Sequence, residues 1–216
     1  MINVLYIHGM GGGGDSRIPS ILNSYFASCD GPARLVKVTV RTYDFDPEAA
    51  HMQINAWVEE LRPALVIGES LGSLHAVRIK GIPHLLISPA LNAPVFLHAF
   101  AYLTLIPGMS WLLGKIYKPR EGDRQKLDFR YGLLRKYRDH RKAALSCSSR
   151  NGNTDLFVAF IGLRDHYRKY GVVSIRTWRK HFGQTVVLYD GTHFTEEEYI
   201  YSLVIPQILN ILGIKK

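Results

Sequence analysis

The sequence predicts one α/β domain in which a mostly parallel sheet of about six strands is flanked by helices. Apolar runs alternate with segments of helical spacing along most of the chain, and parallel strands need such helical crossovers. A length of 216 residues with 47% hydrophobic residues suits a single domain spanning residues 1–216. The stretch 65–76 also runs from an apolar strand through Gly-x-Ser-x-Gly into a helical pattern.

Six apolar runs have the length and the boundaries of strands. The first ends at the glycines of residues 9–14, and the second is rich in β-branched residues between turn signals. The fifth is apolar without interruption, which is typical of a strand buried in a parallel sheet. The expected strands are residues 3–8, 35–40, 64–67, 83–88, 156–162 and 185–189.

Helical spacing fills most of the segments between these runs. Pro47 suits the first turn of one helix, and three glutamates at 196–198 suit the first turn of the last, where negative charge is favoured. The expected helices are residues 18–26, 48–61, a segment after Ser70, 171–181 and 195–212.

Residues 91–153 are too long for an ordinary connection between a strand and a helix. We therefore expect an insertion that forms a mainly helical cap over Ser70. Its first half, residues 93–116, is almost wholly apolar and is expected to face the substrate pocket. The expected substrate contacts in this half are Phe96, Phe100, Leu103 and Trp111.

The net charge of +9 is concentrated in the second half of this insertion. Residues 115–142 contain eleven Lys or Arg and four Asp or Glu, so +7 of the +9 lies there. Because no nucleic-acid-binding motif accompanies this segment, we expect no nucleic-acid partner. Contact with a membrane surface through the insertion is a less favoured hypothesis, and the sequence does not indicate the oligomeric state.

Two distant cysteines, Cys29 and Cys147, indicate neither a disulfide framework nor a metal cluster. The first apolar run is too short for a signal peptide or a membrane span, and no basic segment precedes it. We expect a cytoplasmic protein that uses no metal and no other cofactor.

Catalytic side chains are expected at the carboxyl ends of the strands. With a strand order of 2-1-3-4-5-6, the order reverses between the first and third strands, where the glycine loop and the Ser70 turn would face each other. Gly68 and Gly72 leave room for a sharp strand-to-helix turn there, and the N–H group of Leu71 would begin the helix, where an oxyanion is favoured.

A serine nucleophile needs a base within hydrogen-bond reach, and the base needs an acid that orients it. Asp165 follows the fifth strand and His193 follows the sixth, in the chain order Ser, Asp, His. Asp155 and Asp190 also lie near strand ends, so both remain alternatives to Asp165.

These motifs resemble the α/β-hydrolase superfamily, and among its members the small bacterial esterases of the YqiA type. The similarity rests on His8-Gly9, on residues 68–72, on Asp165 and on residues 191–194, and it covers roughly residues 2–90 and 155–212. It implies a carboxylesterase-like serine hydrolase that cleaves an ester or thioester, with Ser70 as nucleophile, His193 as base and Asp165 as the orienting acid. It also implies an oxyanion hole formed by the backbone N–H groups of Met10 and Leu71. The insertion is longer than in the shortest members, so the resemblance implies no particular substrate.

Two other functions fit parts of the sequence. Residues 9–14 satisfy G-x-G-x-x-G after a first strand, and Arg41 at the end of the second strand suits a 2′-phosphate, which indicates an NADP-binding oxidoreductase. The apolar and basic insertion fits a non-catalytic module with the hydrolase fold that binds an anionic or membrane surface. Within the hydrolase hypothesis, the sequence does not separate hydrolysis from acyl transfer.

Overall fold

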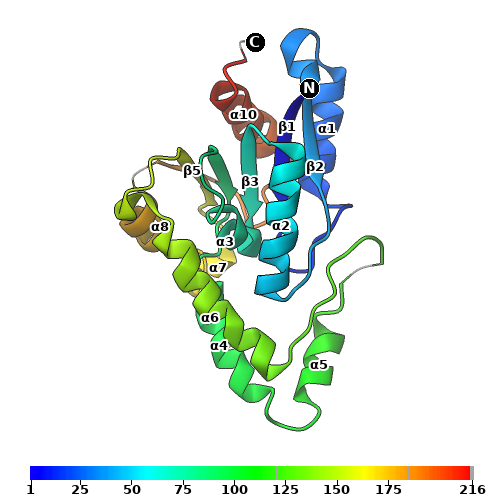
Figure 1. Ribbon diagram of the computed structural model, residues 1–216, viewed down its shortest axis with the longest axis vertical. Helices are drawn as coiled ribbons and strands as arrows, with labels where there is room; N and C mark the ends of the chain where they lie inside the picture. Colours follow the sequence, from blue (N-terminus) through cyan, green and yellow to red (C-terminus); the bar gives the residue numbers. More distant parts are fainter. Residues whose placement is uncertain (120, 184, 215–216) are drawn as a thin grey trace.

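A computed structural model describes residues 1–119, 121–183 and 185–214, and its centre is a sheet of six parallel strands (Figure 1). The strand order is β2-β1-β3-β4-β5-β6, and all five pairings are parallel, which confirms the predicted sheet. The strands are β1 (Ile2–Ile7), β2 (Val36–Val40), β3 (Leu65–Glu69), β4 (His84–Ile87), β5 (Phe157–Gly162) and β6 (Val186–Tyr189).

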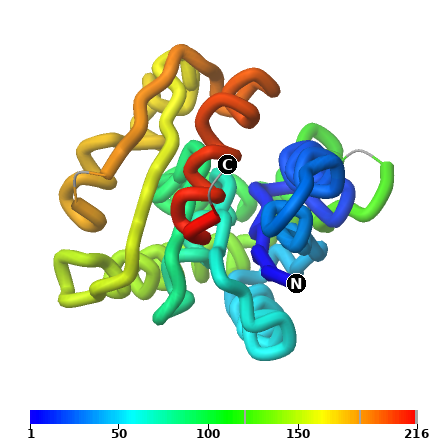
Figure 2. Tube along the Cα trace, turned by 90° about the horizontal axis from the view of Figure 1, so that it is seen from above, coloured from blue at the N-terminus to red at the C-terminus, as the bar shows by residue number. Residues whose placement is uncertain are grey.

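Helices cover both faces of the sheet, and successive strand residues point to opposite faces (Figure 2). Val4 and Tyr6 pack with α1 (Arg17–Ser28) and the C-terminal helix α10 (Ile205–Ile211). Leu5 and Ile7 belong to the core of the other face, which is covered by α2 (Pro47–Leu61), α3 (Ser73–Ala76), α6 (Tyr131–Ser146) and α8 (Ile175–Phe182). The sheet is therefore buried on both sides, as expected for parallel strands.

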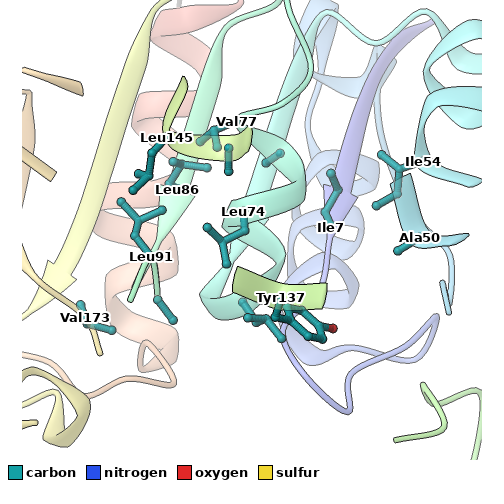
Figure 3. Close-up of a cluster of buried hydrophobic side chains, with 14 of the residues drawn as sticks. Ile7, Ala50, Ile54, Leu74, Val77, Leu86, Leu91, Tyr137, Leu145 and Val173 are labelled. Atoms are coloured by element: carbon teal, nitrogen blue, oxygen red, sulfur yellow. The ribbon is translucent and has the colours of Figure 1, made fainter. Parts of the chain in front are cut away.

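The region expected to form a cap contains three helices, α4 (Ala93–Leu103), α5 (Met109–Ile116) and α6. Of these, α6 is part of the core, because Tyr137 and Leu145 lie beside Leu74 and Leu86 (Figure 3).

The helix after Ser70 is short: a 3₁₀ turn, η2 (Ser70–Gly72), leads into the four residues of α3. The long helix α6 packs against α2, α3 and α4. Arg120 of the basic segment lies outside the described residues.

The C-terminal helix is interrupted where one continuous helix over 195–212 was expected. It consists of α9 (Glu197–Tyr199), a π-helical turn η4 (Ile200–Val204) and α10. Pro206 has no N–H to donate to the preceding turn, which accounts for a wider turn at this point. The helix begins later than expected because Thr195 has a left-handed backbone with φ 46°.

The remaining elements are short. Two 3₁₀ segments, η1 (Gly31–Leu35) and η3 (Ser149–Asn151), precede β2 and β5. A single-turn helix, α7 (His166–Lys169), follows β5 and was not predicted. The predicted helix 171–181 begins only at Ile175, where the Ser174 hydroxyl caps it by accepting the Thr177 N–H at 3.1 Å. In the part of the chain that the structure describes, no helix is both long and apolar enough to cross a membrane.

Four buried aromatic and imidazole rings pack against one another in a row that begins at His8, directly after β1. His8 stacks on Tyr43 with ring centroids 4.2 Å apart, Tyr43 meets His75 edge-on at 5.1 Å, and His75 lies 4.3 Å from His140. Burial lowers the pKa of His8 to about 4 and that of His140 to about 3, and it lowers the pKa of His75 well below its ordinary value. Burial also lowers the pKa of His84, the first residue of β4, to about 4. These histidines are neutral in the folded protein at pH 7.

We expect acid to destabilise the protein through these four histidines. Their folded-state pKa values lie below the unfolded value of about 6.5, so the unfolded chain binds more protons as the pH falls. Their stabilising contribution is complete above about pH 6.5 and declines toward pH 4. Between pH 7.5 and 5.5 the free energy of unfolding should fall by roughly 1 kcal/mol for each of His8, His84 and His140. Urea titrations at the two pH values measure this change.

His75→Phe gives the sharpest test, because neither ring nitrogen of His75 has a hydrogen-bond partner among the described residues. Over the same pH range the free energy of unfolding of the variant should fall by less than that of the wild type, because one of the sites that takes up a proton on unfolding is gone. Leu74→Ala is the control: it destabilises the neighbouring core position without removing a proton site. An unchanged pH slope in His75→Phe would show that this ring is not neutral in the fold.

Candidate active site

The turn after β3 has the backbone geometry of a nucleophile elbow. Ser70 has φ 49°, a strained value for a residue other than glycine, and such strain is concentrated at functional sites. A side chain at Gly72 would place its Cβ 2.3 Å from the carbonyl oxygen of His8, and one at Gly68 would meet Ala76 at 2.8 Å. Both glycines are therefore needed for the turn to lie this close to β1 and α3.

Ser70, His193 and Asp165 form a continuous chain of hydrogen bonds. The Oγ of Ser70 lies 2.9 Å from Nε2 of His193, and Nδ1 of His193 lies 2.8 Å from Oδ2 of Asp165. An ionised carboxylate only accepts hydrogen bonds, so Nδ1 carries the proton and Nε2 is left as an acceptor for the serine hydroxyl. His193 and Asp165 are buried, whereas Ser70 is partly exposed. The arrangement suits transfer of the serine proton to the imidazole.

The structure distinguishes Asp165 from the two alternative acids. The second oxygen of Asp165 accepts the backbone N–H of Tyr167 at 2.8 Å and caps α7, which fixes the carboxylate toward His193. Asp190 is exposed and pairs with Arg164 at 3.0 Å. Asp155 accepts the N–H of Gly81. Only Asp165 of these three carboxylates contacts the histidine.

The loop that carries His193 is held from both sides. Arg17 on α1 donates to the carbonyl oxygens of Phe194 and Thr195 at 2.5 and 2.6 Å. The Tyr167 ring meets the imidazole edge-on, with centroids 4.6 Å apart. These contacts limit rotation of the ring. Sequence reasoning did not find Tyr167, although its position two residues after Asp165 is a usable signal.

The glycine loop lies beside the Ser70 turn, as expected from the strand order. Ile7 is in register with Gly68, and a Cβ on Gly9 would lie 3.1 Å from the Cβ of Ser70. The N–H of Met10 has no acceptor among the described residues, so it is available to a ligand. The Leu71 N–H lies at the start of the helical turn after the serine.

A residue of the insertion, Gln125, fixes this loop and was missed by the sequence analysis. Its Oε1 accepts the Gly11 N–H at 3.1 Å, its backbone N–H donates to the Gly12 carbonyl at 2.7 Å, and its amide donates to the Asp44 carbonyl at 3.2 Å. Gln125 is fully buried. A lone glutamine in a basic segment carries no local sequence signal for such a role.

The same contacts argue against a dinucleotide site in the loop. The N–H of Gly12 donates to the Gly9 carbonyl, that of Gly13 to the Ser16 hydroxyl and that of Gly14 to the Thr42 hydroxyl. Asp123 lies against Gly13 and Gly14, where an anionic pyrophosphate would have to approach. Arg41, the expected 2′-phosphate contact, is held by both carboxylate oxygens of Glu60.

The expected substrate contacts on the insertion are largely exposed. The exposed fraction is 37% for Phe96 and Phe100, 46% for Leu103 and 64% for Trp111. On α4 the small residues Pro94 and Ala101 are buried, which leaves the large residues toward solvent. The described rings nearest His193 are instead Tyr167, Phe194 and His166. Substrate contact by the four residues stays a prediction.

Within residues 1–119, 121–183 and 185–214, no group of three His, Cys, Asp or Glu side chains is placed to hold a metal ion. The hollow of about 310 Å³ lined by Asp46, Arg130 and Lys136 involves none of the residues of the Ser70 site.

Comparison with solved structures identifies the class: the chain has the α/β-hydrolase fold. It is similar to a monoacylglycerol lipase of Paleococcus ferrophilus, with 17% identity, coverage of 98% of this chain and 94% of the lipase, and a TM-score of 0.63. It is also similar to Est1E of Butyrivibrio proteoclasticus with bound ferulic acid, with 15% identity, coverage of 99% and 90%, and a TM-score of 0.64.

The fold alone does not define the reaction. The bottromycin epimerase BotH is also similar, with 12% identity, coverage of 98% of this chain and 90% of the epimerase, and a TM-score of 0.54. No protein-family model and no curated protein matches the sequence. The function therefore has to be argued from the site.

Gln125→Ala is expected to loosen the glycine loop. The substitution leaves the part-buried N–H of Gly11 without its acceptor, which should lower the free energy of unfolding by about 1–3 kcal/mol. Amide hydrogen exchange of residues 11–14 should become faster by a larger factor than exchange in the buried strand β5, which follows only the loss of global stability. Lys126→Ala, at the exposed neighbouring position, is the control. Equal exchange in both variants would show that Gln125 does not hold the loop.

Proposed function

We propose that the protein is a serine hydrolase that cleaves a carboxylic ester or thioester through an acyl-enzyme on Ser70. The observation that carries the proposal is the hydrogen-bonded series from Ser70 through His193 to Asp165 on a strained turn. The similarity in fold to a monoacylglycerol lipase and to Est1E agrees with it.

In the acylation step, His193 Nε2 takes the proton of the Ser70 hydroxyl while Oγ attacks the carbonyl carbon of the substrate. The carbonyl oxygen becomes an oxyanion. When the intermediate collapses, the bond to the leaving group breaks, and the proton on His193 passes to the departing alkoxide or thiolate. Asp165 holds Nδ1 and stabilises the imidazolium that forms in between.

The oxyanion is proposed to be held by the backbone N–H groups of Met10 and Leu71. The first belongs to the loop fixed by Gln125, and the second lies at the start of a helical turn, where backbone donors are unpaired. A water molecule then attacks the acyl-enzyme, with His193 as its base, and releases the acid and free Ser70. Phe96, Phe100, Leu103 and Trp111 are proposed to contact the acyl group.

Replacement of the nucleophile is the first test. Ser70→Ala should lower kcat for a p-nitrophenyl ester by roughly 10⁴-fold or more and should abolish labelling by a fluorophosphonate, because no oxygen remains to be acylated. Ser73→Ala, which changes a buried serine of the same turn, is the matched control and should still be labelled. Full labelling of Ser70→Ala would mean that another residue is the nucleophile. Absence of labelling in the wild type would favour a non-catalytic module.

The orienting acid is tested by a pair of amide substitutions. Asp165→Asn should lower kcat by roughly 10³- to 10⁴-fold, because an amide does not hold His193 in the required tautomer or stabilise its cation. Asp190→Asn removes only an exposed ion pair and should keep nearly full activity. If activity survived Asp165→Asn and were lost in Asp190→Asn, the acid would have been assigned to the wrong strand end.

A further inference from the structure

Exposed apolar side chains gather where α4 turns into α5. We call this surface the apolar tip, and it consists of exposed side chains from the last turn of α4, the connecting turn and α5. Trp111 and Ile116 are exposed to more than 60%. An exposed apolar surface rimmed by polar residues marks an interaction site more often than chance. The members of the tip are Tyr102, Leu105, Ile106, Trp111, Leu112 and Ile116.

Positive charge surrounds the apolar tip. Residues 93–117 contain no Asp or Glu. The Lys115 ammonium lies 4.0 Å from the ring centre of Trp111, and Lys118 is exposed just beyond α5. Arg135 stacks on Tyr131, whose ring lies 5.8 Å from that of Tyr102. In the described chain, none of these three cations forms an ion pair.

The apolar tip lies at the end of the molecule that the active site faces. Figure 1 shows both termini at one end and the turn between α4 and α5 at the other. Because β1 starts near the N-terminus and all strands are parallel, their carboxyl ends, with Ser70, point toward the tip. A surface bound at the tip would therefore lie on the substrate side of the sheet.

We propose that the apolar tip docks on an anionic lipid bilayer. Tryptophan and tyrosine beside lysine suit the boundary between headgroups and acyl chains, and the lysines attract acidic headgroups. The helices α4 and α5 have 11 and 8 residues, so they lie in the interface rather than cross it. A second copy of the chain is a poorer occupant, because a symmetric contact would bring the cations of two tips together without acidic partners.

The test is co-sedimentation with vesicles, using the Ser70→Ala chain so that turnover plays no part. Vesicles of 70% phosphatidylcholine and 30% phosphatidylglycerol should bind the protein, and pure phosphatidylcholine vesicles should bind it more weakly. Leu105→Ser with Ile106→Ser should weaken binding by about tenfold or more, because two apolar side chains that would enter the bilayer are lost. Lys115→Glu with Lys118→Glu should weaken binding to the acidic vesicles by about fivefold or more for each lysine at low salt.

Matched substitutions elsewhere on the surface serve as controls. Leu35→Ser with Met52→Ser changes exposed apolar residues, and Lys37→Glu with Lys80→Glu changes exposed lysines, so both pairs should keep wild-type binding. Tryptophan fluorescence should shift to the blue with acidic vesicles, and Trp111→Phe should abolish the shift, because Trp178 is fully buried and Trp57 lies on α2, away from the apolar tip. Three results would overturn the proposal: no binding by the parent chain, equal loss in the control pairs, or a stable dimer in sedimentation that the Leu105 and Ile106 changes dissociate.

These outcomes are independent of catalysis. Binding of vesicles by the Ser70→Ala chain supports docking whatever the reaction is, and loss of ester hydrolysis in that chain tests the reaction whatever the tip binds. A chain that hydrolyses soluble esters and leaves acidic vesicles untouched would keep the proposed function and reject the docking.

Discussion

The active site depends on how closely the end of β1 approaches the turn after β3. The carbonyl oxygen of His8 lies where a side chain at Gly72 would be, and Gly9 lies against Ser70. Two glycines, one after β1 and one after β3, therefore allow this close contact. That contact places the loop of Met10 next to Ser70, which has a left-handed backbone. Ser70 lies directly after β3, and Leu65, Val66 and Ile67 of this strand are buried in the cores on the two faces of the sheet, which hold the strained turn in place.

Much of this arrangement could be predicted from the sequence because it is encoded locally. Apolar runs ending in glycine or aspartate reveal buried strands and the loops at their carboxyl ends, and a parallel sheet brings those ends to one edge. Ser70, Asp165 and His193 were found in this way, and the structure brings the three side chains within hydrogen-bond distance. The choice among three aspartates was not local, because it depends on which carboxylate the chain turns toward His193.

The features that could not be predicted depend on contacts between segments that are far apart in the sequence, and no local sequence pattern indicates such contacts. The helix after Ser70 is short, and α6, much later in the chain, supplies Tyr137 and Leu145 to the core that a longer helix would have covered. Gln125 is a similar case, since its partners Gly11 and Asp44 are far away in the sequence. Residues 91–153 are therefore partly structural: α6 packs in the core of the domain, and Gln125 fixes the loop beside Ser70.

The cations of residues 91–153 have different surroundings near the core of the domain and near the apolar tip. Toward the core, cations of the insertion are paired, as with Lys136 on Asp46 and Arg124 on Asp15. At the apolar tip, Lys115 lies over the exposed ring of Trp111, and Lys118 follows the exposed residues Ile116 and Tyr117. Charge paired within the fold contributes little to binding a partner, whereas unpaired charge next to exposed aromatic residues does. The net charge of +9 is thus a poor guide to partners, and the few unpaired cations near Trp111 are the informative part of it.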